Sequence, residues 1–196
     1  MGTHEEAALA AAVWGDVSAA SATGDPVPDV ESQGTEPDPR DVARQIVLRQ
    51  LAMAPRSRAE LLQKLAKRGC TAEVAGAVLD RMTQVGLVDD EAYAQMLVRS
   101  QQVGRGLAKR ALARELRTKG IEGQLADDAL SSISDEDERD RARALVDKKL
   151  RAMHGLGIEV QTRRLAGMLA RKGYSSSVTY AVIREAIADA PEHLPD

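Results

Sequence analysis

Apolar residues recur along most of this chain at spacings of three, four and seven positions, as in helices with one buried face. No stretch alternates between apolar and polar residues as a half-exposed strand does. The pattern predicts nine helices, at 41–54, 57–68, 71–85, 89–103, 106–119, 122–133, 135–154, 160–172 and 175–189. The predicted fold class is therefore all-α.

A short cassette occurs three times and divides these helices into groups of three. Its copies are Leu65–Cys70, Leu116–Ile121 and Leu169–Tyr174, and their glycines lie 51 and 53 residues apart. A recurrence at such a period is typical of repeat proteins, whose units contact mainly their neighbours. We therefore expect three tandem three-helix repeats, at 41–88, 89–134 and 135–190, in an elongated, curved array.

Each cassette has the chemistry of a helix end. Its glycine readily adopts the left-handed conformation that terminates a helix, and the next residue then packs against the leucine four positions before the glycine. The Lys and Arg residues before the glycine suit the negative end of the helix dipole, so part of the basic charge has a structural role. Helix starts are predicted at four caps: Ser57 with Glu60, Asp89, Ser134 with Asp137, and Ser175.

Composition separates a tail from the helical part of the chain. Residues 1–39 hold eight acidic residues and no Lys or Arg, and four of the seven prolines also lie there. We expect residues 1–40 to form a disordered acidic tail and 191–196 a short C-terminal tail. The net charge of −3 hides a basic remainder, because residues from Arg40 onward carry 27 basic against 22 acidic side chains.

The sequence offers little of the chemistry that an enzyme needs. It contains one cysteine and three histidines, without the spacing of a metal site, a nucleophile elbow or a phosphate-binding loop. We therefore predict no catalytic residue, no metal and no cofactor. No segment resembles a membrane helix or a signal peptide, so we expect a cytoplasmic protein.

Basic side chains are concentrated in the middle repeat. At about 100° per residue, Arg110, Arg114 and Arg117 share one stripe of a helix, and Leu112 and Leu116 point the opposite way. The stripe is either a solvated face, in which Arg114 pairs with an acidic neighbour such as Glu115 or Asp128, or a face that binds phosphates or carboxylates. The candidate contact residues are Arg105, Lys109, Arg110, Arg114, Arg117, Arg58 and Arg164.

The junction of the first two repeats carries a recognisable motif. Residues 86–94 read Gly-Leu-Val-Asp-Asp-Glu-Ala-Tyr-Ala, and further matching positions follow up to Ile121. This string closely resembles a motif of the RecX family. The resemblance extends over about residues 41–190 and is weakest in the third repeat. The family-motif residues are Asp89, Asp90, Tyr93, Lys119, Gly120 and Ile121.

The resemblance implies a regulatory protein that binds the RecA recombinase filament on DNA. Such a protein restrains ATP hydrolysis, strand exchange and coprotease activity, and so acts in DNA repair, recombination and the SOS response. Weak contacts to DNA phosphate and a monomeric state are also expected. The main alternative is a helix-turn-helix DNA-binding protein or transcriptional regulator, because each repeat has the size of such a domain. A further alternative is a protein-only scaffold that interacts through its alanine-rich surfaces and acidic tail.

Overall fold

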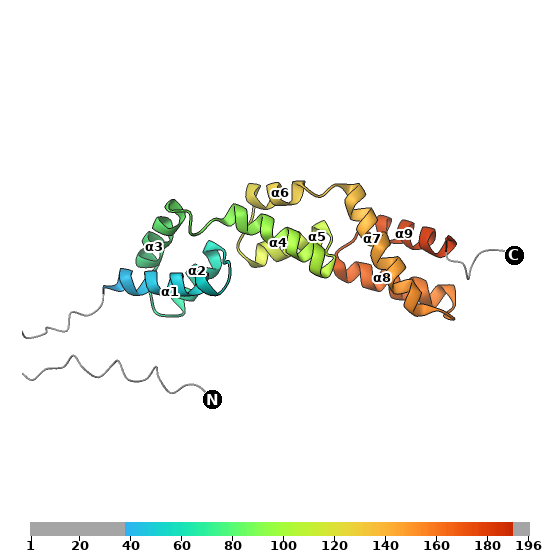
Figure 1. Cartoon of the computed structure of the whole chain (residues 1–196), viewed down its shortest axis with the longest axis horizontal. Helices are drawn as coiled ribbons and strands as arrows, with labels where there is room; N and C mark the ends of the chain where they lie inside the picture. The colour runs from blue at the N-terminus through green and yellow to red at the C-terminus, as the bar shows by residue number, and fades with distance from the viewer. Residues whose placement is uncertain (1–37, 190–196) are drawn as a thin grey trace, which may run out of the picture. The chain divides into compact units, whose positions relative to one another are not determined.

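A computed structural model describes residues 38–189, which form nine α-helices, one short 3₁₀-helix and no strand. The helices pack together in consecutive groups of three (Figure 1). Repeat 1 contains α1 (Pro39–Met53), α2 (Arg58–Ala66) and α3 (Ala72–Gln84). Repeat 2 contains α4 (Asp90–Arg105), α5 (Lys109–Thr118) and α6 (Gln124–Ser131). Repeat 3 contains α7 (Asp135–Leu150), η1 (Arg151–Met153), α8 (Ile158–Lys172) and α9 (Ser176–Ala188). The all-α class and the three three-helix repeats are confirmed.

Each repeat has an apolar core of its own. Buried residues at matching register positions form these cores: Leu61, Leu65 and Leu79; Leu112, Leu116 and Leu130; Leu165, Leu169 and Ile183. Burial of one such leucine contributes about 1.5–3 kcal/mol. One residue departs from the division by repeat, because Ala108 of repeat 2 packs into the core of repeat 3.

The predicted helix starts are confirmed. Ser57 and Ser134 each accept a hydrogen bond from the backbone three residues on, and Glu60 and Asp137 accept a reciprocal bond from the cap backbone. Asp89 caps α4 and Ser175 caps α9, each by accepting a hydrogen bond from the backbone amide three residues on. These bonds satisfy amides that the first helical turn leaves unpaired.

The predicted helix end occurs in all three cassettes. The glycines have positive φ values of 80°, 72° and 91° at residues 69, 120 and 173. The amide after each glycine donates to the carbonyl of the cassette leucine, at 3.0–3.2 Å, and the glycine amide donates three residues back. This pair of bonds is the Schellman arrangement that the sequence predicts.

A few helix limits differ from the prediction. Helix α1 begins at Pro39 because Asp38 caps it, two residues before the predicted start. Helix α4 runs through Gly104 to Arg105 and ends at Gly106. The predicted 135–154 helix ends at Leu150 and tightens into η1. Nearly all of the predicted acidic tail, and the C-terminal tail, lie outside the described residues.

Candidate interaction face and the joints between repeats

The cassette of repeat 2 packs on the start of α2 in repeat 1. The Ser57 hydroxyl donates to the backbone carbonyl of Lys119 at 2.6 Å, and Ser57 is fully buried. Gly120 lies so close to α2 that a Cβ placed on it would stand 2.3 Å from the Cβ of Ala59. Glycine is therefore required at position 120 both by its backbone conformation and by its neighbour.

A polar cluster completes this joint. Lys119 Nζ lies 2.6 Å from Glu60 Oε1, and the Tyr93 hydroxyl donates to Glu60 Oε2 at 3.1 Å. The Asp90 carboxylate accepts from the Arg58 backbone amide at 2.8 Å. Motif residues from repeat 2 thus bind three groups at the start of α2.

The cluster shifts the acidity of two of its members in opposite directions. Burial raises the pKa of Glu60, but hydrogen bonds from Lys119, Ser57 and Tyr93 and the charge of Lys119 together hold that pKa below its usual value. Burial, with the charge and hydrogen bond of Glu60, raises the pKa of Tyr93 to about 12. The cluster therefore favours an ionised carboxylate beside a neutral phenol.

The same joint recurs between repeats 2 and 3. The amide of Ala108, which is the register equivalent of Ser57, donates to the carbonyl of Lys172 at 2.9 Å. A Cβ on Gly173 would lie 2.7 Å from both the Cβ and the backbone nitrogen of Ala111. The Tyr174 hydroxyl donates to the Gly106 carbonyl at 3.2 Å, and Glu138 accepts from the Lys109 amide at 2.9 Å.

These contacts account structurally for the motif that the sequence singled out. Asp89 caps α4, whereas Asp90, Tyr93, Lys119 and Gly120 reach across to repeat 1. Ile121 is 2% exposed in the core of repeat 2. The motif therefore describes a joint between repeats, and the exposed candidate residues lie elsewhere.

The exposed stripe of α5 is the principal candidate face. As the helical spacing predicts, Arg110, Arg114 and Arg117 are exposed, whereas Leu112 and Leu116 are buried. Within residues 38–189, neither Arg110 nor Arg114 has an ion pair, so the pairing of Arg114 with Glu115 or Asp128 that one of the two interpretations included does not form. Arg117 lies 3.9 Å from Glu122, and both side chains are mostly exposed.

The remaining candidate cations differ in how they are held. Arg105 pairs with Glu115 at 2.9 Å, and Arg58 pairs with Asp80 at 2.5 Å. Lys109 is half-buried, and its ammonium donates to the Ile133 carbonyl at 3.3 Å. Arg164 is exposed and has no ion pair with any described residue. Arg110, Arg114 and Arg164 are thus the candidates whose guanidiniums are most available to a partner.

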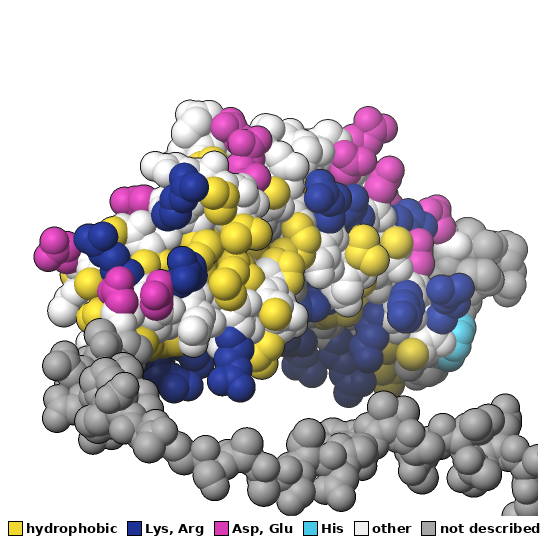
Figure 2. All heavy atoms as spheres, turned by 60° about the vertical axis from the view of Figure 1, so that its left-hand side comes forward, with side chains coloured by type: hydrophobic (Ala, Val, Ile, Leu, Met, Phe, Trp, Pro, Cys, Tyr) yellow, Lys and Arg dark blue, Asp and Glu magenta, His cyan; other side chains and the backbone are white. Residues whose placement is uncertain are grey.

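The charge of the described surface is unevenly distributed. Figure 2 shows a group of Lys and Arg side chains along the lower edge of the viewed face, whereas the acidic side chains lie above that edge, among further Lys and Arg side chains. A basic edge of this kind favours contact with an anionic partner, because few acidic side chains lie beside it to repel that partner.

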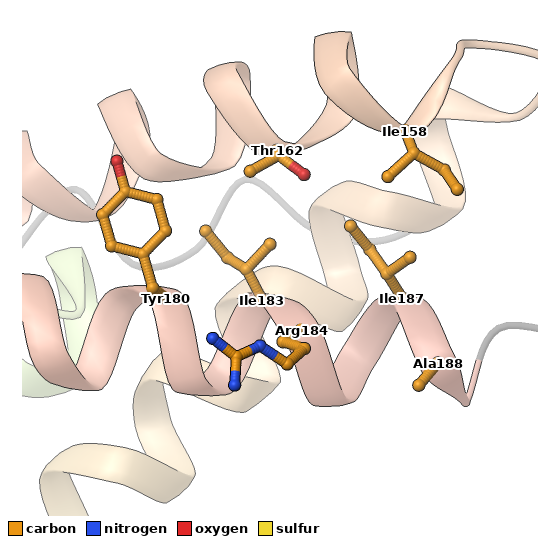
Figure 3. Close-up of a pocket in the computed structure, with 7 residues that line it drawn as sticks. All are labelled: Ile158, Thr162, Tyr180, Ile183, Arg184, Ile187 and Ala188. Atoms are coloured by element: carbon orange, nitrogen blue, oxygen red, sulfur yellow. The ribbon is translucent and has the colours of Figure 1, made fainter.

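An apolar groove of about 490 Å³ lies between α8 and α9. Ile158 and Thr162 of α8 face Tyr180, Ile183 and Ile187 of α9, and Arg184 lies at its rim (Figure 3). None of the candidate contact residues lines this groove. Residues 38–189 hold no group of three or more His, Cys, Asp or Glu side chains placed to bind a metal. Their helices also include none long and apolar enough to cross a bilayer.

Three three-helix units with repeated joints define a tandem helical-repeat protein. The sequence models of the first, second and third three-helix domains of RecX match residues 43–82, 89–130 and 135–183, respectively. These matches cover more than half of the chain. The chain belongs to the RecX family of regulatory proteins.

Several relatives have the same name, regulatory protein RecX. The chain is 51% identical over 162 residues to the Streptomyces coelicolor protein, a span that covers 81% of this chain and 86% of the relative. It is 48% identical over 143 residues to the Thermobifida fusca protein, covering 73% and 77% of the two chains. It is 44% identical over 171 residues to the Mycolicibacterium smegmatis protein, covering 85% and 90%.

Solved structures share the fold. The crystal structure of RecX from Lactobacillus salivarius superposes with a TM-score of 0.68 at 21% identity, covering 76% of this chain and 97% of that one. A crystal structure described as regulatory protein RecX gives a TM-score of 0.66 at 27% identity, covering 76% and 72%.

Proposed function

We propose that this protein binds the RecA filament on DNA and inhibits its ATPase, strand-exchange and coprotease activities, without catalysing a reaction itself. Membership of the RecX family supports a regulatory role. The observation that carries the proposal is the pair of exposed guanidiniums at Arg110 and Arg114, which have no ion pair within residues 38–189. They lie one helical turn apart on the middle repeat.

The chemistry of this pair suits a filament of protein and DNA. A guanidinium presents a planar fork of donors that matches both carboxylates and phosphates. Because Arg110 and Arg114 are exposed, their contacts are screened over about 10 Å at 0.1 M salt. Binding is therefore expected to weaken as salt rises, with RecA carboxylates as the main partners and DNA phosphates as weaker ones.

The test reverses these two charges and measures RecA ATPase on single-stranded DNA. The Arg110→Glu/Arg114→Glu variant should need a concentration at least about tenfold higher for half-inhibition, a change of about 1.4 kcal/mol. The matched control is Arg49→Glu/Arg184→Glu, which changes the net charge equally at two exposed arginines on α1 and α9. Circular dichroism verifies that both variants keep their helices.

Two results would contradict the assignment of the face. A folded Arg110→Glu/Arg114→Glu variant that inhibits as well as the unchanged protein would remove α5 from the contact. Equal weakening by the control would show that net charge, and not this face, determines binding.

The helix-turn-helix alternative is addressed by a binding comparison. In this alternative the third helix of a repeat would lie against DNA. In repeat 2 that helix is α6, where Asp127 and Asp128 are both exposed, and their carboxylates would repel DNA phosphates. Binding is measured to bare duplex, bare single strand and RecA-coated single strand at two salt concentrations. Preference for the coated strand supports the filament regulator, whereas tight binding to a particular bare duplex supports the DNA-binding alternative.

A further inference from the structure

Repeat 1 contains a polar cavity that lies apart from the α5 face and shares only Glu60 with the polar cluster of the first joint. It has a volume of about 210 Å³ and is lined by Gln50, Arg56, Glu60, Leu61, Gln63, Lys64 and Lys67. Three of these side chains are cationic and one is anionic. The single carboxylate is that of Glu60. It lies 2.6 Å from the ammonium of Lys119, which does not line the cavity, and 3.7 Å from the Arg56 guanidinium. The cavity therefore has an excess of positive charge.

Arg56 has a donor that no described group satisfies. Its Nε is buried and has no hydrogen-bond partner, although its terminal nitrogen reaches Glu60. Leaving a buried donor unpaired costs free energy, and a charged donor costs more than a neutral one. Because Nε itself is buried, a ligand in the cavity would accept this hydrogen bond once the guanidinium turns toward it, and the cost would then be removed.

The other repeats show that the fold does not require these cations. The register equivalents of Arg56 are Leu107 and Val160, and those of Lys64 are Glu115 and Met168. Leu107 is 5% exposed in the core of repeat 2. Repeat 1 thus places a guanidinium where an apolar side chain serves the same helix packing elsewhere.

We propose that this cavity binds a phosphate group. Donors come from several side chains around one cavity, namely the Arg56 guanidinium, two lysine ammoniums and two glutamine amides. This arrangement suits a tetrahedral anion with three or four acceptor oxygens, whereas the fork of one arginine already satisfies a planar carboxylate. A volume of about 210 Å³ admits a phosphate together with bound water, each water needing about 30 Å³. The proposal goes beyond RecA regulation and its test needs no RecA.

The test is a titration of the full-length protein with inorganic phosphate at constant ionic strength, followed by the Arg56 Nε–H resonance in ¹H–¹⁵N NMR spectra. We expect a saturable shift of this resonance. Arg56→Leu, which installs the side chain of repeat 2, should weaken binding at least about tenfold, as measured by ³¹P NMR. Lys64→Met, which installs the side chain of repeat 3, should also weaken it.

The control variant is Arg184→Leu, which removes one positive charge from α9, far along the chain from this cavity. It should bind phosphate as the unchanged protein does. An unsaturable shift, or equal affinity in folded Arg56→Leu, would overturn the proposal. Equal loss in Arg184→Leu would show that only general charge attraction is present.

Further titrations identify the source of the phosphate. A nucleoside monophosphate, a single-stranded oligonucleotide with a 5′ phosphate and the same oligonucleotide without it are compared at Arg56 Nε–H. Binding of the mononucleotide indicates a free-nucleotide site, and binding of both oligonucleotides indicates a DNA-backbone site. A site that prefers an acidic peptide to all of these probes would contradict the phosphate assignment.

Discussion

The three cassette glycines should respond very differently to alanine, although the sequence presents them as equivalent. All three have positive φ, so each substitution places an alanine in the left-handed region at a cost of about 1–2 kcal/mol. Alanine also lowers the conformational entropy of the unfolded chain, which offsets about 0.4–1 kcal/mol of this cost. At Gly69 a Cβ meets nothing within 4 Å, so the net loss there should be about 1 kcal/mol.

The neighbouring repeat adds a second cost at the other two positions. A Cβ at Gly120 would lie 2.3 Å from the Cβ of Ala59, and one at Gly173 would lie 2.7 Å from the backbone nitrogen of Ala111. Overpacking of this kind costs about 1–3 kcal/mol beyond the backbone strain. Gly120→Ala and Gly173→Ala should therefore each lose about 2–4 kcal/mol.

The free energy of unfolding, measured by urea denaturation, compares the three variants. Ala59→Gly removes the atom that obstructs a side chain at 120, so the Ala59→Gly/Gly120→Ala double variant should recover about 1–3 kcal/mol in a double-mutant cycle. Ala111→Gly should not rescue Gly173→Ala, because the backbone nitrogen remains in the way. Equal losses at Gly69 and Gly120, or no coupling between 59 and 120, would refute the joint geometry.

Two further predictions follow from the first joint. Ser57→Ala should lose about 2 kcal/mol of unfolding free energy, because it removes a helix cap worth about 1 kcal/mol and the hydrogen bond to the Lys119 carbonyl. Ser134→Ala removes only a capping box and should lose about half as much. Equal losses in the two variants would contradict this account. The pKa of Tyr93 is raised to about 12 from an ordinary 10, so its stabilising effect is complete below pH 10 and is lost as the pH rises to about 12. Tyr93→Phe should flatten the decline in urea stability over that interval, and an unchanged decline would show that the phenol is not held neutral by the fold.

The sequence predicted the helices well because each repeat buries apolar residues at helical spacing and marks its ends with local signals. Ser57 with Glu60 and Ser134 with Asp137 act within one turn, and each cassette acts within six residues, so a sequence pattern is sufficient to locate them. The limits of α1 and α4 were less well predicted. Asp38 caps earlier than expected, and Gly104 is tolerated inside a helix that ends at the next glycine.

The roles of the motif and of the charges were harder to predict. Helical spacing shows which face of α5 is exposed, but it does not show that Arg105 pairs with Glu115 or that the backbone amide of Lys109 donates to Glu138 of repeat 3. Those contacts, like that between Asp90 and the Arg58 amide, join residues in different helices through polar and backbone groups. Polar contacts of this kind leave no apolar periodicity in the sequence. The alignment of the three repeats gives a clearer signal for the cavity of repeat 1, because Arg56 stands where the other two repeats have an apolar residue.

The spacing of the joint bonds along the chain sets an order of assembly during synthesis. Ser57 binds a carbonyl 62 residues further on, and Tyr174 binds one 68 residues back. A ribosome adds about 5–20 residues per second, so each repeat emerges complete seconds before the cassette that locks it to the next. The joint between repeats 1 and 2 therefore closes before the joint between repeats 2 and 3, and the direction of translation orders the array.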